Sequence, residues 1–359
     1  MATTAAPRPI DSDKLNALLG QAVADMGAAM HAPLIVIGDR LGLYRAMGNG
    51  EPMTAAELAR RTGTAERYIQ EWLNANAAAH YVEYDAASGT YFMSPEQSFA
   101  LAQDDTGVHL PGFYHMVASC MKDEEKLTEV FRTGEGFGWH EHEKGLFEGC
   151  ERFFRPSYLA NLTSSWIPAL DGVEARLRAG ARVADIGCGH GASTLLMAQT
   201  YPQSEFFGFD YHAGSIERAR EKAEAAGLKD RVHFDVSMAQ AFPGKDYDFV
   251  ACFDCLHDMG DPAGAARHVR GALAEDGSWM IVEPFAGDDV ASNLNPIGRI
   301  YYAASTVVCV PASRSQEVGA GLGAQAGEKR IGDVVSQGGF TRFRRATETP
   351  FNMVFEARP

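Results

Sequence analysis

The sequence predicts an α/β fold in which helices cover a parallel sheet, preceded by a helical winged-helix domain. From about residue 180, short apolar runs alternate with helical segments, a pattern typical of a parallel sheet covered on both faces. Before residue 100, a helix-turn-helix pattern is followed by a hairpin pattern. We therefore expect three regions: a winged-helix dimerisation domain at 1–100, a helical linker or substrate lid at 101–165, and an α/β domain at 166–359.

Composition limits the classes of partner and location. The 359 residues are 46% hydrophobic and 22% charged, which is ordinary for a globular protein. The net charge of −15 disfavours nucleic acid as a general partner, because an acidic surface repels phosphates. Six cysteines are too few for a disulfide framework. With no signal-peptide pattern and no run of ~18 apolar residues, we expect a cytoplasmic protein without a membrane partner.

The first expected element is a helix over residues 14–47. Apolar residues recur along it at helical spacing, from Leu15 to Leu43. A face that is apolar over this length would be poorly soluble alone. We therefore expect it to be covered by a second subunit, giving a homodimer.

The winged-helix pattern follows. Thr54 and Glu57 form a capping-box pattern, Gly63 ends that helix, and Thr64 is expected to cap the next. The stretch YVEYDAASGTYFMS predicts two short strands around a turn. Because the second helix carries one arginine and two glutamates, we expect a dimerisation or lid role rather than DNA binding, which remains the alternative.

The α/β region begins near residue 180. The runs RVADIG, EFFGFD, RVHFDV, YDFVACFD and WMIVEP are the expected parallel strands. Helices are expected at Ala192–Thr200, Gly214–Ala226 and Ala263–Leu273. The last twenty residues predict a hairpin with its turn at Thr349–Pro350, which would add antiparallel edge strands.

A glycine-rich turn follows the first of these strands. Gly187, Gly189 and Gly191 allow the backbone to approach a ligand closely. With Ala192 and an acid at Asp210, they also satisfy the dinucleotide pattern, so a nicotinamide-dependent oxidoreductase is one alternative. Asp185, however, would repel a diphosphate and attract the cationic amino acid end of S-adenosylmethionine (SAM). Asp235, at the end of the third strand, could bind an adenine amino group.

The order of these motifs resembles that of class I SAM-dependent methyltransferases. The resemblance rests on DIGCGHG, the acids of GFDYH and HFDV, and the run KDYDFVACFD, and covers about residues 165–359. It implies a Rossmann-like seven-stranded sheet and a SAM-binding catalytic domain at 166–359. The residues expected to contact the cofactor are Asp185, Gly187, Gly189 and Gly191 (methionine end), Asp210 (ribose), Tyr211, Asp235 and Val236 (adenine), and Phe253 at the end of the fourth run.

Together with the winged helix, these motifs resemble small-molecule O-methyltransferases. The resemblance implies a general base at His257 in CLHDMGDP, where Met259 replaces the tryptophan of the family pattern. It also implies that Glu283 in MIVEPF orients this histidine. Asp254 is an alternative base or a contact to the amino acid end of SAM.

The sequence therefore predicts methyl transfer from SAM to a small molecule, by preference to a hydroxyl, without a metal. Aromatic residues suit a flat acceptor, and we expect Phe113, Tyr114, His115, Trp139 and Tyr158 to line its pocket. An inter-domain core is the alternative role for each. The glycine-rich stretch 311–330 is either a flexible loop over the site or a surface connection. A SAM-sensing winged-helix regulator is a further alternative function.

Overall fold

The computed structural model describes residues 9–359, and the chain forms two compact units. The first contains the residues up to Gln103 together with His109–Ala118, and the second contains Asp104–Val108 and Ser119–Pro359. The region expected at 101–165 is thus divided between the two units. Its role as a linker or lid stays a prediction.

The first unit has the predicted order of helix, turn, helix and hairpin. Its elements are α1 (Ser12–Arg40), α2 (Leu43–Met47), α3 (Ala55–Thr62), α4 (Glu66–Ala78), β1 (Glu83–Asp85), β2 (Thr90–Phe92) and α5 (Pro95–Leu101). The prediction of a single helix over 14–47 is wrong. Gly42 adopts a left-handed backbone conformation (φ 68°), which separates α1 from α2.

The caps of the winged-helix pattern are partly as expected. The Thr54 hydroxyl accepts from the amide of Glu57 at 3.2 Å, and Gly63 ends α3 with φ 67°. The expected cap at Thr64 is wrong: the residue before α4 is Ala65, which has no side-chain acceptor. The amphipathic pattern fixes the helix, but the cap depends on where the backbone first turns.

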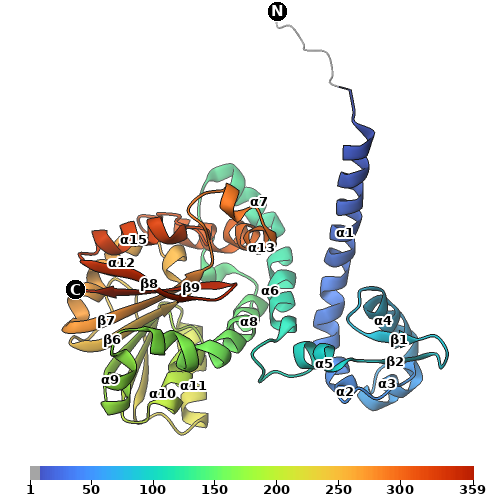
Figure 1. Cartoon of the computed structure of the whole chain (residues 1–359), viewed down its shortest axis with the longest axis horizontal. Coiled ribbons are helices and arrows are strands. Elements are labelled where there is room, and N and C mark those ends of the chain that lie inside the picture. Colours follow the sequence, from blue (N-terminus) through green and yellow to red (C-terminus); the bar gives the residue numbers. More distant parts are fainter. Residues whose placement is uncertain (1–8) are drawn as a thin grey trace, which may run out of the picture. The chain divides into compact units, whose positions relative to one another are not determined.

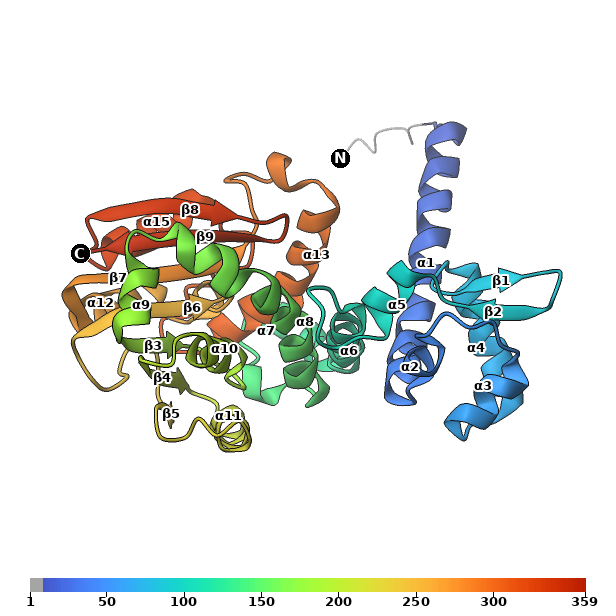
Figure 2. The same ribbon diagram turned by 60° about the horizontal axis from the view of Figure 1, so that its bottom comes forward.

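The C-terminal part of α1 packs within the first unit, whereas its N-terminal part extends beyond the other elements of this unit (Figures 1 and 2). The Trp72 indole donates to the Leu34 carbonyl at 2.9 Å, which fastens α4 to α1. Towards the N-terminus, large apolar side chains of α1 are exposed, including Leu19 (53%), Met26 (60%) and Met30 (75%). Within the described chain, the first unit leaves this face open to solvent.

The second unit holds the sheet. Its helices are α7 (Glu124–Thr133), α8 (Gly145–Asn161), α9 (Val173–Ala179), α10 (Ala192–Thr200), α11 (Ala213–Ala225), α12 (Pro262–Ala272), α13 (Pro296–Ala304), α14 (Val310–Arg314) and α15 (Gly327–Gln337); α6 (Leu110–Lys122) is divided between the units. Its strands are β3 (Arg182–Ile186), β4 (Glu205–Asp210), β5 (Val232–Val236), β6 (Tyr247–Phe253), β7 (Leu273–Pro284), β8 (Arg342–Glu348) and β9 (Asn352–Arg358).

Within residues 9–359, these seven strands form one sheet in the order β5-β4-β3-β6-β7-β9-β8. The first five are parallel, and the C-terminal hairpin adds β9 and β8 antiparallel, as predicted. The strand order reverses between β3 and β6. In open α/β sheets, the carboxyl ends of strands at such a reversal border a ligand crevice.

Helices cover both faces of the sheet (Figure 1). Successive residues of a strand point to opposite faces, so Val183 packs with α9, α10 and α11 while its neighbour Ala184 packs with α12 and α15. Both faces are therefore apolar, which explains the continuous apolar runs in the sequence. No helix among the described residues is long and apolar enough to cross a bilayer.

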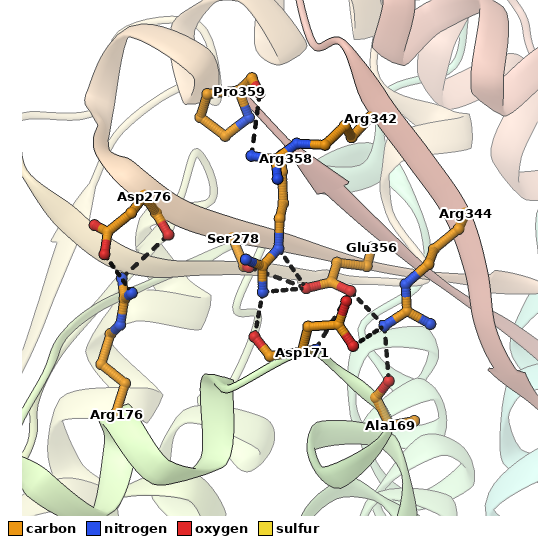
Figure 3. Close-up of polar contacts among 10 residues, drawn as sticks. All are labelled: Ala169, Asp171, Arg176, Asp276, Ser278, Arg342, Arg344, Glu356, Arg358 and Pro359. Atoms are coloured by element: carbon orange, nitrogen blue, oxygen red, sulfur yellow. Dashed lines mark hydrogen bonds and ion pairs between the residues drawn. The ribbon is translucent and has the colours of Figure 1, made fainter.

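A buried carboxylate fastens the C-terminal hairpin to the loop before α9 (Figure 3). Glu356 on β9 accepts hydrogen bonds from the Ser278 hydroxyl (3.1 Å) and the Arg358 guanidinium (2.9 Å), and it pairs with Arg344. Arg344 also donates to the Ala169 carbonyl at 3.0 Å and pairs with Asp171. The edge strands are thus held by charge-assisted bonds as well as by the sheet ladder.

Candidate functional site

The glycine turn lies at the carboxyl end of β3, where the sequence places it. Gly187, Gly189 and Gly191 have φ values of 69°, 52° and 77°. A Cβ on Gly187 would lie 2.7 Å from the Cys255 sulfur, and one on Gly191 would lie 2.6 Å from the Phe234 ring. Both backbone angle and packing therefore require glycine at these two positions.

Asp185 lies fully buried beside this turn. The hydroxyls of Ser193 and Thr194 donate to its Oδ2 at 2.7 and 2.6 Å, while its Oδ1 has no hydrogen-bond partner among the described residues. Burial raises the pKa of this carboxyl to about 6, against the effect of the two hydroxyls. A buried acceptor atom without a partner suits a ligand that brings a cationic or donor group. Ser193 and Thr194 lie in the first turn of α10, just after the glycine turn, and the motifs in the sequence did not indicate their role.

Asp210 ends β4 and organises the two loops beside it. Its carboxylate accepts from the amide of Gly189 at 3.0 Å and from the amide of His212 at 2.8 Å. Burial raises its pKa, and these two amides oppose the rise. Asp210 thus fixes the glycine turn to the loop after β4, in addition to any contact with a ribose.

Residues 139–151 cover these two loops. The His140 ring contacts the Tyr211 ring edge-on at 6.4 Å, and Phe147 stacks on His212 at 4.8 Å. Glu151 on α8 accepts from the His190 ring at 2.8 Å and pairs with Lys222. Burial opposes ionisation of Glu151, but His190 and Lys222 outweigh it and lower its pKa to about 2.

The other expected cofactor residues have different surroundings. Asp235 is more than half exposed and pairs with Arg220 at 3.1 Å, so an adenine would share or replace this partner. Val236 is exposed, whereas Phe253 is buried and packs against Tyr158 at 5.2 Å. Their roles as cofactor contacts stay predictions.

His257 and Glu283 meet in a buried pair. Glu283, near the end of β7, accepts from Nδ1 of His257 at 2.6 Å and from the amide of Leu256 at 3.1 Å. Both side chains are almost completely buried. Burial disfavours a charged imidazole, but the Glu283 carboxylate outweighs it and raises the pKa of His257 above the ordinary value of 6.5. The ring is thus oriented by the predicted glutamate.

The second ring nitrogen of His257 has a partner that the sequence did not suggest. Its Nε2 lies 3.3 Å from the sulfur of Cys309, the last residue of a π-helical turn, Ser305–Cys309, between α13 and α14. Cys309 is 52 positions away in the chain, so no local pattern could indicate the contact.

Asp254 follows β6 with a left-handed backbone (φ 49°), which Asp tolerates better than most residues. Its Oδ1 accepts from the Asn352 amide at 2.8 Å, and its buried Oδ2 has no partner among the described residues. Burial, with the nearby Glu283, raises its pKa well above the usual range. The role of Asp254 as an alternative base or as a contact to the amino acid end of SAM stays a prediction.

The expected acceptor-binding residues do not all belong to one unit. Phe113, Tyr114 and His115 are in the first unit, where His115 is buried against Asp39 (2.8 Å) and Tyr114 bonds to Tyr81 (2.6 Å). Trp139 and Tyr158 are in the second, where Trp139 contacts Phe147 at 5.1 Å. Their common role as a pocket lining stays a prediction.

The glycine-rich stretch 311–330 is fastened to the segment that carries His257. The Ser313 hydroxyl donates to the Met259 carbonyl at 2.8 Å, the Gln316 side chain bonds to Gly260 and Asp258, and the amide of Gly323 donates to the His257 carbonyl at 3.0 Å. α14 and the start of α15 also fall within it. These bonds anchor the stretch to the segment that carries His257, and its role as a flexible loop over the site or a surface connection stays a prediction.

Known protein families match both units. Residues 29–103 match an Rv2258c-like winged HTH domain, and residues 177–310 match a methyltransferase domain. Among curated relatives, 27-O-demethylrifamycin SV methyltransferase of Amycolatopsis mediterranei is 33% identical over 131 residues, which cover 34% of this chain and 48% of that protein. The chain spans no more than about half the length of the first curated relatives it matches.

Solved structures share the fold over nearly the whole chain. A putative O-methyltransferase from Nostoc punctiforme has a TM-score of 0.71 at 18% identity, covering 98% of this chain and 99% of that one. The O-methyltransferase of neocarzinostatin biosynthesis, solved with S-adenosylhomocysteine (SAH) and 1,4-dihydroxy-2-naphthoic acid, has a TM-score of 0.62 at 18% identity and covers 94% and 98%. The chain therefore joins an Rv2258c-like winged helix-turn-helix domain to a methyltransferase domain, in the fold of the O-methyltransferases.

Proposed function

We propose that this protein transfers a methyl group from SAM to a hydroxyl group of a small molecule. One observation carries the proposal: the buried pair of His257 and Glu283 is close to the glycine turn. His257 lies two residues after Cys255, and the sulfur of Cys255 contacts that turn. Cys255 also donates to the Ile186 carbonyl at 3.3 Å, immediately before that turn. A base and a nucleoside-binding turn are thereby brought to the same end of the sheet.

The residues around the turn fit SAM. The Oδ1 of Asp185, which has no hydrogen-bond partner among the described residues, would accept from the ammonium of the methionine end. Asp210, at the end of β4, would bind the ribose, and Tyr211 would contact the adenine. A diphosphate would be repelled by Asp185 once that carboxyl is ionised, which argues against a nicotinamide dinucleotide. When bound, SAM supplies an activated methyl group on a positively charged sulfur. Catalysis then depends on alignment, which is worth ~7–11 kcal/mol in favourable cases.

The role of His257 is to take the proton of the acceptor hydroxyl. Because Nδ1 donates to Glu283, only Nε2 can accept that proton, and the ring must be neutral when it does so. The raised pKa of His257 means that turnover rises with pH along an acid limb above the ordinary histidine value of 6.5. Glu283 stabilises the imidazolium that forms.

The aromatic residues, and the naphthoic acid bound in the structure of the O-methyltransferase of neocarzinostatin biosynthesis, suggest a flat hydroxylated acceptor. We also propose a homodimer that uses the exposed face of α1. Cys188, Cys252 and Cys309 are buried thiols, which fits a reducing compartment such as the cytoplasm.

Thermal melting with SAM, SAH and NADH tests the cofactor. A ligand at ~100 times its dissociation constant adds ~2.7 kcal/mol to the free energy of unfolding. We expect SAM and SAH to raise the melting temperature and NADH to leave it unchanged. A shift with NADH alone would favour the oxidoreductase, and the lack of any shift would reject the cofactor proposal.

Replacing His257 tests the base. We expect His257→Ala to lower turnover of a hydroxynaphthoic acid acceptor by at least ~10²-fold, because general-base assistance is lost. SAH affinity, measured by calorimetry, should hold. The control is His233→Ala, at the half-exposed edge of the sheet, which should leave both quantities unchanged. Unaltered turnover in His257→Ala would exclude this histidine.

A further inference from the structure

The Cys309 contact gives the base a second partner. Nδ1 of His257 faces Glu283, a carboxylate that accepts hydrogen bonds, so this nitrogen carries a hydrogen in both ring states. In the charged ring Nε2 also carries a hydrogen, and the atom within its reach is the Cys309 sulfur, at 3.3 Å. Cys309 is 8% exposed, and the described chain offers Nε2 no other partner at hydrogen-bond distance.

The surroundings keep this cysteine as a neutral thiol. Burial raises the pKa of Cys309, and the carboxyls of Asp258 and Glu283 add to the rise, against the opposing effect of His257. The other titratable groups near the pair are Asp254, Cys120 and Cys150. While the ring is neutral, Nε2 accepts a hydrogen bond from the thiol of Cys309; when the ring is charged, the sulfur accepts the Nε2 hydrogen as a weak acceptor.

The backbone around Cys309 is built to present it. It ends a π-helical turn, a rare conformation that occurs often at functional sites. The same turn is anchored at Ser305, whose hydroxyl accepts from the amide of Ala324 at 3.0 Å. Since Gly323 bonds to the His257 carbonyl, the turn and the base are fixed to the same segment.

We propose that Cys309 is a positioning residue for the base: its sulfur accepts the Nε2 hydrogen of the charged His257 and so stabilises the state that forms when the base takes the acceptor's proton. In that step the hydroxyl O–H bond breaks, the Nε2–H bond forms, and the oxygen keeps the electron pair that would form its bond to the methyl group. The bond between that methyl group and the SAM sulfur would break at the same time, with its electron pair left on the sulfur of SAH. The proton later leaves to solvent. This inference rests on the proposed function for its catalytic meaning, but the contact itself can be tested without an acceptor.

Nuclear magnetic resonance of the His257 ring in the ligand-free protein tests the proposal. We expect Cys309→Ala to lower the measured pKa of His257 by about half to one pH unit, the size of one lost hydrogen bond to the charged form. Cys309→Ser should restore a value near that of the wild type, because a hydroxyl oxygen also accepts. Should the alanine variant not fold, Cys309→Val removes the same acceptor.

The matched control is Cys188→Ala, which removes a buried thiol whose charged neighbours are Asp185 and Asp210 and should leave the His257 pKa unchanged. An unchanged or raised pKa in Cys309→Ala, or the same fall in Cys188→Ala, would overturn the proposal. Calorimetry with SAH on the wild type separates the two claims. Absent SAH binding rejects the proposed function while the pKa comparison still stands, and intact SAH binding with an unchanged pKa rejects only the role of Cys309.

Discussion

At the scale of single residues, the site contains buried carboxyl groups whose ionisation lowers the stability of the folded protein. Asp185 is fully buried, and its pKa rises from 3.8 to about 6. Since the unfolded chain releases this proton at lower pH than the folded protein, the free energy of unfolding falls as pH rises through this window. A shift of this size costs roughly 3 kcal/mol at neutral pH. A carboxylate kept at such a cost indicates a ligand that compensates it.

Asp185→Asn should therefore separate stability from binding. We expect the ligand-free variant to melt at a higher temperature at neutral pH, because no charge is buried. SAH affinity should fall by about 10–100-fold, the value of one charge-assisted hydrogen bond. In the wild type, SAH affinity should weaken as pH falls through about 6. Calorimetry across pH measures both effects, with the exposed Asp230→Asn as control. A lower melting temperature with unchanged affinity would contradict this account.

At the scale of elements, one carboxylate fastens α8 over the glycine turn and to α11. Glu151 joins α8 to His190 in the glycine turn and to Lys222 on α11. We expect Glu151→Gln to raise the dissociation constant of SAH by about tenfold, mainly through faster release, because the cover opens more easily. Stopped-flow binding measures the rates. Glu148→Gln, on the exposed side of the same helix, is the control, and an equal effect there would argue against a specific fastening.

The C-terminal hairpin offers a second prediction at this scale. Glu356→Ala should lower the free energy of unfolding by about 2–4 kcal/mol, because it leaves Arg344 and Arg358 without their buried partner. Glu348→Ala removes an exposed carboxylate that pairs with Arg345 and should cost no more than about 1 kcal/mol. Urea unfolding of both variants provides the comparison. Similar losses in the two would show that burial of Glu356 adds nothing.

At the scale of the whole molecule, the exposed face of α1 predicts self-association. At 100° per residue, Leu19, Met26 and Met30 fall on one side of the helix, and all three are more than half exposed. We expect the wild type to be a dimer by light scattering, and Leu19→Glu with Met26→Glu to give a monomer. Ala28→Glu, on the opposite side of α1, should remain a dimer. A monomeric wild type would contradict this prediction.

The sequence by itself determined the strands and turns that are encoded by patterns of neighbouring residues. Alternating apolar runs predicted the strands, and the spacing of glycines predicted the turn after β3. The resemblance to O-methyltransferases implied the pair of His257 and Glu283, which the structure joins at 2.6 Å. These features depend on neighbouring residues or on the rule that parallel strands end at one edge. Such patterns can be recognised in a sequence because the backbone geometry of helices and strands repeats along the chain.

The tertiary structure decided which distant residues meet. It placed Cys309 against His257, 52 positions apart, brought Glu356 to Asp171 across 185 positions, and assigned residues 109–118 to the first unit. Packing sets these contacts, since each depends on how whole elements lie in space rather than on any spacing in the chain. The residues that alter the pKa values of the site, such as Cys309 beside His257, are contacts of this kind between distant parts of the chain.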